Sequence, residues 1–248
     1  MPGVRTVAMT TNGVALSPAK AKALHAAGLS CINISLDTLQ RTRFEAVSRR
    51  PASYWDATRR AIDAALALPF DSVKLNCVLL RGVNDDELAE FVELTRSQPL
   101  HVRFIELMPF GGNAWTSDKF LAAGEAIASL QQRYPSMHPL GVDGTSQRFG
   151  IDGHAGSVGF IASMSAAFCA TCDRLRLTAD GNVRACLHGA HEVPMKHLLE
   201  AGDVDGLRAA VRSALGAKHA ALGGEAGMHA LSRAAQHADA RPMIKIGG

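Results

Sequence analysis

Residues 73–84 read Val-Lys-Leu-Asn-Cys-Val-Leu-Leu-Arg-Gly-Val-Asn, and this stretch decides the fold class. The apolar-rich run Val73–Leu80 has the length of one β-strand and ends at a glycine-containing turn. Asn84 is followed three residues later by Glu87, the spacing of a capping box, which predicts a helix from Asp85. The stretch therefore predicts a strand that is followed directly by a helix.

The same order of strand and helix repeats on both sides of this stretch. Ser17 and Pro18 suit a helix N-cap and first turn, and Gly28 suits the end of that helix. Strands that alternate with helices predict a parallel sheet in an α/β fold. A run of about four such strands does not close, so we expect an incomplete TIM-barrel-like sheet with an unpaired edge and an uncovered apolar face. The other predicted strands are Val4–Met9, Cys31–Ser35 and Val102–Leu107, and the other predicted helices begin at Pro18, near Leu39 and at Ser117.

Composition indicates a globular chain of one to two domains. Its 248 residues are 47% hydrophobic and 20% charged, and no apolar run approaches the ~18 residues of a membrane span. The net charge of +3 is too small to indicate nucleic-acid binding. Five cysteines without a signal-peptide pattern favour metal ligation in a reducing compartment over a disulfide framework. We therefore expect a cytoplasmic protein, or a mitochondrial one if a eukaryotic transit peptide has been lost.

Three of the cysteines lie close together in the sequence. Cys169 and Cys172 form a C-x2-C pair, and Cys186 follows after thirteen residues. The alternating runs 175–178 and 183–187 flank a Gly-Asn turn and predict a β-hairpin. This hairpin returns Cys186 toward the pair, so the pattern predicts a site for a soft metal.

Two metal sites fit this spacing equally well. An iron–sulfur cluster held by three cysteines leaves one iron open to substrate. A structural zinc ion normally takes four protein ligands, and His188 or His191 is suitably placed to complete the set. A thioredoxin-like redox pair is disfavoured, because it opens a helix after a strand and needs no third cysteine.

Two arginines follow the cysteine pair. Arg174 and Arg176 are two residues apart in the predicted strand, so their side chains share one face beside Cys172. Adjacent guanidinium groups suit a phosphate or triphosphate. Arginines on a hairpin are more often solvated surface, and only the neighbouring cysteines favour an anion-binding strip here.

In a parallel sheet, functional side chains gather at the carboxyl edge, where strands end and helices begin. Several polar residues and one methionine are predicted to lie there. Each also has a structural explanation, such as forming a turn, capping a helix, filling the core or extending a long side chain to solvent. The edge candidates are Thr10, Asn12, Ser35, Asp37 and Met108, with Lys74 inside a strand.

The segment FCATCDRLRLTADGNVRACL, residues 168–187, resembles the C-terminal cluster motif of the GTP 3',8-cyclases, the MoaA-type radical S-adenosylmethionine enzymes that begin molybdenum cofactor synthesis. Motifs similar to that family occur in the same order from the first residues to the last, and together they are highly specific. They are MTTNG at 9–13, INISLDTL at 32–39, VKLNCVLLRGVND from 73, RFIELMPFG from 103, and the terminal Ile-Gly-Gly at 246–248.

The resemblance implies a fold and a reaction. The fold is a partial radical SAM barrel, expected at residues 1–122, followed at 123–248 by a C-terminal iron–sulfur and GTP-binding region that contains the hairpin. The reaction converts GTP to 3',8-cyclo-7,8-dihydroguanosine triphosphate: a deoxyadenosyl radical takes hydrogen from ribose C3', and the carbon radical then attacks C8 of the same guanine.

The resemblance also assigns a cluster and a catalytic tail. Cys169, Cys172 and Cys186 match the ligands of a [4Fe-4S] cluster whose open iron meets the guanine. Gly247 and Gly248 match a double-glycine tail that reaches into the active site, where the lack of side chains permits close approach. The alternative for this tail is a frayed terminus.

Further matched positions bind the nucleotide and the cosubstrate. Arg174, Leu175 and Arg176 match the GTP-binding segment, and the two arginines are also counted as catalytic. Thr10 and Lys74 match other GTP contacts. The matched S-adenosylmethionine contacts are Ser35 and Met108.

One departure from the family concerns a second cluster. The N-terminal C-x3-C-x2-C loop that holds the S-adenosylmethionine-cleaving [4Fe-4S] cluster is absent from this sequence. Cys31 and Cys77 lie singly in predicted strands and are better explained as small buried apolar residues. We therefore expect that this chain alone binds one cluster and does not turn over GTP.

Two other functions remain open, a zinc-stapled binding module and a catalytically inactive relative that binds GTP and a cluster. The resemblance implies a homodimer and, as pathway partner, the next enzyme, cyclic pyranopterin monophosphate synthase. It implies neither nucleic-acid nor membrane binding.

Overall fold

The computed structural model describes residues 3–113, 115–166, 169, 172–189, 191–219, 222–237, 241–243 and 246. The chain forms two compact units. Unit 1 comprises Met1–Leu107 and Asp118–Ala162, and unit 2 comprises Met108–Ser117 and Ser163–Gly248. Unit 2 thus takes in a short segment from the middle of the chain. The domain boundary expected after residue 122 stays a prediction.

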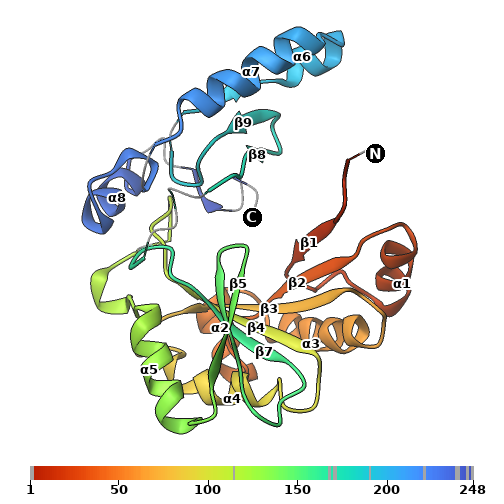
Figure 1. Ribbon diagram of the computed structural model, residues 1–248, viewed down its shortest axis with the longest axis vertical. Helices are drawn as coiled ribbons and strands as arrows, with labels where there is room; N and C mark the ends of the chain where they lie inside the picture. Colours follow the sequence, from red (N-terminus) through yellow and green to blue (C-terminus); the bar gives the residue numbers. More distant parts are fainter. Residues whose placement is uncertain are drawn as a thin grey trace. The chain divides into compact units, whose positions relative to one another are not determined.

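Unit 1 is built on a seven-stranded sheet with strand order β1-β2-β3-β4-β7-β6-β5 (Figure 1). Strands β1 to β4 and β7 pair in parallel, whereas β5 and β6 form an antiparallel hairpin that joins β7. Among the described residues β1 and β5 lie at the two ends of this order, so the sheet is open, as expected for a partial barrel. The strands are β1 (Ala8–Thr11), β2 (Cys31–Ser35), β3 (Ser72–Leu79), β4 (Leu100–Glu106), β5 (His138–Asp143), β6 (Ser146–Gly150) and β7 (Ser157–Ile161).

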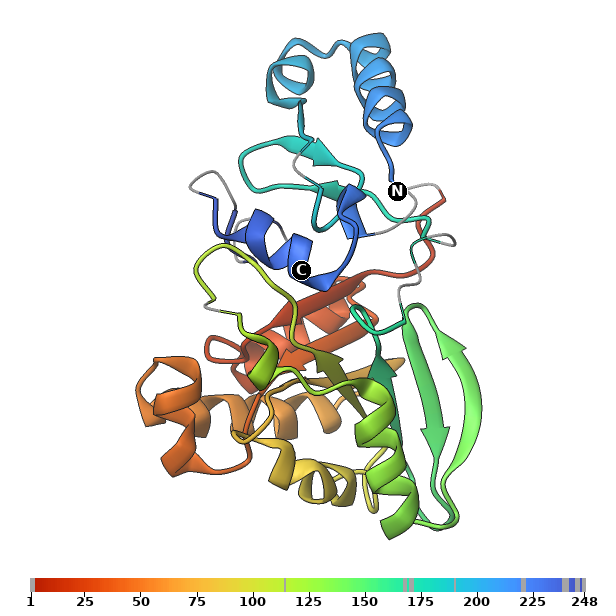
Figure 2. The ribbon, with the colours of Figure 1, turned by 90° about the vertical axis from the view of Figure 1, so that its left-hand side faces the viewer.

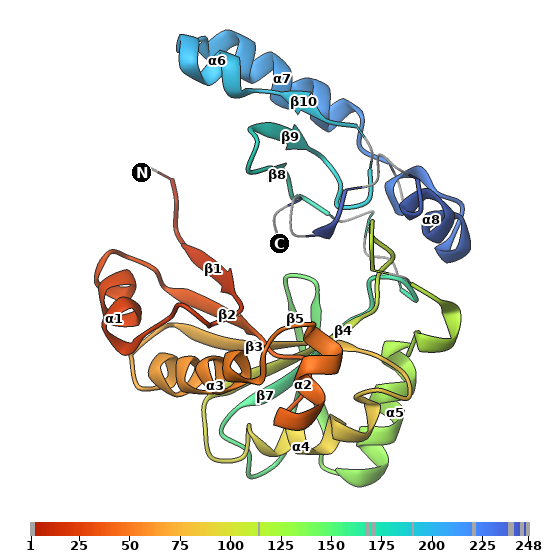
Figure 3. The ribbon, with the colours of Figure 1, turned by 180° about the vertical axis from the view of Figure 1, so that it is seen from behind.

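The helices of unit 1 pack on the apolar side of the sheet (Figure 3). Ile34 of β2, Phe104 of β4 and Phe160 of β7 project to this side and are almost fully buried. The rings of Phe104 and Phe160 lie 5.4 Å apart, and burying such rings stabilises the fold by roughly 1.5–3 kcal/mol each. The helices are α1 (Pro18–Ala26), α2 (Arg41–Ser48), α3 (Ala52–Leu66), α4 (Leu88–Glu93) and α5 (Ala123–Arg133), with 3-10 turns at Asp85–Glu87 and Ser117–Lys119.

Most predicted elements of unit 1 are confirmed. The strand at Cys31–Ser35 has the predicted bounds, and α1 begins at Pro18 with the Ser17 side chain accepting a hydrogen bond from the Lys20 backbone N–H at 3.2 Å. Gly13, in the turn after β1, has φ +78, and a Cβ there would lie 3.0 Å from Ala61 Cβ. Glycine is therefore needed at this turn.

The predicted capping box at Asn84 and Glu87 is wrong. The Asn84 side chain makes no cap hydrogen bond and is instead buried, where its Nδ2 donates to the carbonyls of Asp37 and Val78. Glu87 is buried too and accepts a 2.7 Å hydrogen bond from the Thr38 hydroxyl. Both side chains therefore join the loop after β3 to the loop after β2. A local sequence pattern does not reveal such a contact.

The expected uncovered apolar face is also wrong. On the side of the sheet opposite the helices, the described strand residues are mostly polar along β2, β3 and the start of β4. This polar face of unit 1 carries Thr10, Asn33, Ser35, Lys74, Asn76, His101 and Arg103.

Unit 2 has a smaller sheet with the order β10-β9-β8, all antiparallel (Figure 2). The predicted hairpin is confirmed, since β8 pairs with β9 and Arg176 lies opposite Arg184. Arg174 precedes the strand, so its predicted place in the strand is wrong. The described elements are β8 (Arg176–Leu177), β9 (Asn182–Arg184), β10 (Val193–Pro194), α6 (Lys196–Ala201), α7 (Val204–Gly216), α8 (Met228–Ala235) and a 3-10 turn at Leu222–Gly224.

Across the described part of the chain, no helix has the length and apolar character needed to cross a membrane.

Candidate functional site

The register of unit 1 places three predicted site residues on its polar face. Thr10 of β1 lies opposite Asn33 of β2, and Asn33 lies opposite Lys74 of β3. Ser35 lies two residues further along β2, on the same face. The structure therefore brings Thr10, Lys74 and Ser35 together on one surface.

Hydrogen bonds hold the polar face in a defined arrangement. Asn33 Nδ2 donates to Thr10 Oγ1 at 3.2 Å, and Lys74 Nζ donates to Asp143 Oδ2 of the β5–β6 hairpin at 2.5 Å. The Lys74 side chain is only 15% exposed. The hydrogen bond from Lys74 lowers the pKa of Asp143, although partial burial opposes this change. The side chain of Lys74 is thus partly desolvated and held in place.

Arg103 adds a second cation to the same face. It lies opposite Asn76 on β3, and its Nε donates to Asn76 Oδ1 at 2.8 Å. Burial lowers the pKa of Arg103 from its ordinary value, which still leaves the guanidinium charged at neutral pH. Lys74 and Arg103 lie two residue pairs apart along the β3–β4 register. The face therefore has two neighbouring basic groups, which suit a polyanion.

His101 lies opposite Lys74 and is neutral at physiological pH. Burial, with the positive charge of Arg148 next in importance, lowers the pKa of His101 to about 4. Its Nδ1 lies 2.9 Å from the hydroxyl oxygen of Ser157. His101 therefore adds no positive charge to the polar face.

Two edge candidates have structural roles in the turns. Asn12 Oδ1 accepts a hydrogen bond from the Val14 N–H at 3.1 Å and so shapes the turn after β1. Asp37 Oδ1 accepts from the Val78 N–H at 2.8 Å. Burial raises the pKa of Asp37 to about 6, although this hydrogen bond acts in the opposite direction.

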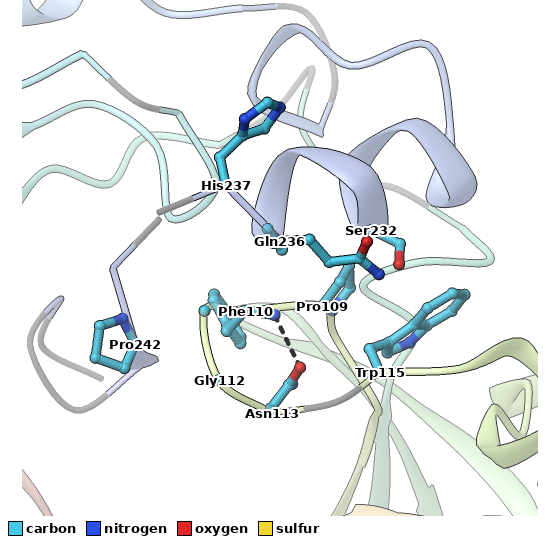
Figure 4. Close-up of a pocket in the computed structure, with 11 residues that line it drawn as sticks. Pro109, Phe110, Gly112, Asn113, Trp115, Ser232, Gln236, His237 and Pro242 are labelled. Carbon is cyan, nitrogen blue, oxygen red and sulfur yellow. Dashed lines mark hydrogen bonds between the residues drawn. The ribbon is translucent and has the colours of Figure 1, made fainter. Parts of the chain in front are cut away.

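Met108 belongs to a turn of unit 2. Asn113 organises this turn, because its Nδ2 donates to the Met108 carbonyl at 2.6 Å and its Oδ1 accepts from the Phe110 N–H at 3.2 Å. The turn and helix α8 line a pocket of about 580 Å³ (Figure 4). Residues that line it are Pro109, Phe110, Trp115, Ser232, Gln236 and Pro242.

The three clustered cysteines are free thiols and half-buried. The Cys172 N–H donates to the Cys169 carbonyl at 3.2 Å, which closes the C-x2-C turn. Burial alone would raise the pKa of the Cys172 thiol, but hydrogen bonds from the Arg174 backbone and side chain, with the charges of Arg174 and Lys218, lower it overall. The surroundings of Cys172 thus favour the thiolate that a metal requires.

Arg176 connects the cysteines with the hairpin. Its side chain is half-buried, and burial lowers its pKa, with Arg174 acting in the same direction. Cys186 and Cys172 act on the pKa of Arg176 in the opposite direction. Arg176 is therefore close enough to both thiols to interact with their charges, whereas Arg174 and Leu175 are more exposed.

The donor set fits an iron–sulfur cluster in its chemistry, with three half-buried thiols, one of them favouring the thiolate. Within the described ranges, no three His, Cys, Asp or Glu side chains converge closely enough to hold a single metal ion. His188 stacks on Phe110 with ring centroids 5.1 Å apart, and His191 is exposed. Burial, with the charges of Arg176 and Arg184, lowers the pKa of His188 to about 4.

The remaining predicted residues divide into three groups. Cys77 is fully buried in β3, as expected for a small apolar residue, and burial raises its pKa. Cys31 is half-buried in β2. Gly247 and Gly248 lie outside the described residues, next to Ile246, which is 2% exposed.

Residues 100–223, half of the chain, match the family model described as Molybdenum Cofactor Synthesis C. The chain belongs to this molybdenum cofactor synthesis family. Residues 1–95 match the model of the Radical SAM superfamily, in agreement with the open, mostly parallel sheet of unit 1. The family resemblance stated from the motifs is therefore confirmed.

Named relatives support the same family. The chain is 44% identical to the mitochondrial GTP 3',8-cyclase of Arabidopsis thaliana, over 100% of this chain and 62% of the relative. It is 41% identical to human molybdenum cofactor biosynthesis protein 1, over 99% of this chain and 38% of the relative. The GTP 3',8-cyclase of Moorella thermoacetica is 44% identical over 82% of this chain and 62% of the relative. The chain thus spans less than two thirds of these relatives.

Sequence reasoning did not assign four residues of the polar face, Asn33, Asn76, His101 and Arg103. The signal was present, because Lys74 and Asn76 alternate with buried Val73, Leu75 and Cys77 in one strand. Such alternation predicts that one face of the strand meets polar surroundings.

Proposed function

We propose that this chain binds GTP and a [4Fe-4S] cluster as a GTP 3',8-cyclase, which acts in the first step of molybdenum cofactor synthesis. The observation that carries this proposal is the set of three half-buried thiols in unit 2, where a backbone hydrogen bond joins Cys172 to Cys169 and Arg176 lies on the hairpin that leads to Cys186. Thiol ligands and a guanidinium group at one place suit a metal cluster beside an anionic nucleotide. The named cyclases among the relatives support the choice of GTP.

On the polar face of unit 1, the proposal assigns Lys74 and Thr10 to GTP and Ser35 to S-adenosylmethionine. Lys74 and Arg103 neutralise the triphosphate, and Thr10, already bonded to Asn33, adds a hydroxyl. The preformed hydrogen bonds of this face reduce the entropy that binding would otherwise cost. In this proposal Lys74, Arg103 and Thr10 together hold the ribose and base in position.

In unit 2, the proposal assigns Cys169, Cys172 and Cys186 to a [4Fe-4S] cluster, and Met108 to S-adenosylmethionine. When bound, these cofactors supply the one-electron chemistry and an open iron for the base. Arg174, Leu175 and Arg176 bind the nucleotide. Gly247 and Gly248 are proposed to approach the substrate without steric hindrance.

The test is anaerobic reconstitution of the full chain, followed by iron, sulfide and zinc analysis and an EPR spectrum before and after addition of GTP. We expect about four irons per chain and a spectrum that GTP changes. Replacing Cys186 with serine should abolish cluster binding. Lys74→Met should leave the iron content unchanged and weaken GTP binding on the order of 10-fold, as expected for a charge-assisted hydrogen bond.

Lys22→Met is the matched control, because Lys22 is exposed on α1 and the change in charge is the same. Stoichiometric zinc without iron, and no response to GTP, would support the zinc-stapled module instead. A cluster that responds to GTP, without any cyclised product, would indicate a catalytically inactive relative.

A further inference from the structure

The chain that follows α7 contacts the cysteine loop through a lysine. Lys218 is half-buried, and its Nζ donates hydrogen bonds to the carbonyl oxygens of Cys172 and, at 3.3 Å, Arg174. Its positive charge also lowers the pKa of the Cys172 thiol. An ammonium group that bonds two carbonyls of one loop fixes the course of that loop. Lys218 therefore holds the backbone that carries Cys172.

The 3-10 turn Leu222–Gly224 contacts the first cysteine. The Leu222 backbone N–H donates to Cys169 Sγ at 3.4 Å. Leu222 is 8% exposed and has φ +42, a left-handed conformation that a residue with a side chain rarely adopts. Such strain persists only where the surroundings enforce it, and it often marks a functional site. Here the strained conformation accompanies an N–H group that is directed at a sulfur.

The same turn packs on the chain that follows the third cysteine. Gly223 has φ +69, and a Cβ there would lie 2.8 Å from both the Gly189 nitrogen and the His188 carbonyl carbon. Only glycine permits this approach to the backbone. Lys218 and the turn Leu222–Gly224, together named the clamp, thus contact all three stretches that carry Cys169, Cys172 and Cys186.

We propose that the clamp positions the cysteine triad and raises the reduction potential of the cluster that it holds. The proposal rests on the proposed function, since it requires a cluster at the triad. An N–H group that bonds a ligand sulfur, and a cation beside another ligand, both stabilise the more negative, reduced state of a cluster. Partners of this kind also retain the metal, and their loss typically weakens metal binding 10–100-fold.

The test compares variants of the full chain after anaerobic reconstitution. Two readouts are used, the rate at which a chelator removes iron and the reduction potential from an EPR-monitored titration. Lys218→Met keeps the aliphatic stem and removes both hydrogen bonds. We expect it to lose iron on the order of 10-fold faster than wild type and to shift the potential to more negative values. Lys218→Arg keeps the charge and donors and should restore both readouts.

A second variant tests the turn. Gly223→Ala should push the turn away from Gly189 and change both readouts in the same direction as Lys218→Met. The matched controls are Lys196→Met, since Lys196 is exposed, and Gly216→Ala, since no atom lies within 4 Å of a Cβ there. Both controls should behave as wild type. Circular dichroism checks folding, and if Gly223→Ala fails to fold, the Lys218 variants decide the outcome.

The clamp is overturned if wild type binds about four irons while Lys218→Met matches it in both readouts. A wild-type chain that takes up no iron overturns the proposed function, and the clamp with it. The two failures are therefore distinguished by the iron content of wild type alone.

Discussion

Unit 1 and unit 2 are stabilised by different interactions. The large hydrophobic core, from Leu16 to Phe160, lies entirely in unit 1, between the sheet and its helices. Unit 2 has short strands, and its buried groups include the charged Arg184, which pairs with Glu192 at 2.7 Å. Arg241 also pairs with Glu192, at 2.6 Å. Apolar burial therefore dominates in unit 1, and polar contacts are prominent in unit 2.

This difference teaches how each unit presents functional groups. In unit 1 a stable core leaves one sheet face available for Lys74 and Arg103. In unit 2 the cysteines lie in loops that are held by hydrogen bonds and ion pairs, so bound metal is expected to contribute to folding. Each unit has one of the two tryptophans, Trp55 in unit 1 and Trp115 in unit 2. Single-tryptophan variants can therefore report on each unit.

The largest expected effect is in the core of unit 1. Phe104→Ala should reduce the free energy of unfolding by about 4 kcal/mol, because it removes a 1% exposed ring that packs on Phe91 and Phe160. Urea denaturation followed by Trp55 fluorescence measures this loss. Val142→Ala is the control, since Val142 is 74% exposed, and it should cost less than about 0.5 kcal/mol. A small loss for Phe104→Ala would contradict a core-dominated unit 1.

The second prediction concerns the buried charges of unit 2. Glu192→Gln should cost about 3 kcal/mol, because it leaves Arg184, whose side chain is 5% exposed, without its counter-charge. Trp115 fluorescence during denaturation provides the measurement. Asp56→Asn breaks the more exposed pair with Arg41 and should have a much smaller effect on stability, because solvent screens that pair. Equal effects of the two substitutions would remove the contrast between the units.

The third prediction uses two groups of unit 1 with opposite pH dependence. The pKa of His101 falls from 6.5 to about 4, so its stabilising contribution is present above pH 6.5 and is lost as the pH falls toward 4. The pKa of Asp37 rises from 3.8 to about 6, so its contribution is present below pH 3.8 and is lost as the pH rises through 6. Each amounts to about 3 kcal/mol, and the two oppose each other between pH 4 and 6.

Removing either side chain should therefore reveal the pH dependence of stability that the other one causes. Asp37→Asn should make stability increase more steeply with pH in this interval, and His101→Gln should make it increase less or decrease. Urea denaturation at a series of pH values, followed by Trp55, measures both slopes. Unchanged slopes in both variants would show that these groups titrate normally in the folded state.

The smallest expected effects come from helix caps, one in each unit. Ser17 caps α1, and Asp203 caps α7 by accepting from the Gly206 N–H at 2.8 Å. Replacing either with alanine should cost about 1 kcal/mol, read from the tryptophan of the same unit. Gln40→Ala serves as control, because Gln40 precedes α2 without a side-chain cap bond. A loss at Gln40 equal to that at Ser17 would refute the cap explanation.

Local patterns predicted much of unit 1. Alternation and flanking glycines located β2 and β3, and the Ser-Pro pair located the start of α1. They did not identify the hairpin β5–β6 or strand β7, which extend the sheet beyond the predicted four strands. The pairing of β7 with β4 joins residues more than fifty positions apart, and no local signal encodes such a partner. The Asn84–Glu87 pattern misled for the same reason, since both side chains bond distant loops.

The sequence by itself determined the parallel α/β class, the spacing of the three cysteines, the hairpin between Cys172 and Cys186, and the family. These depend on residue type and short-range order, which control strand and turn formation directly. Only the tertiary structure decided that Thr10, Lys74 and Arg103 share one polar face, and that Lys218 and Leu222 contact the cysteine loop. Those relations depend on strand register and on backbone approaches between segments far apart in the chain, and residue spacing does not specify either.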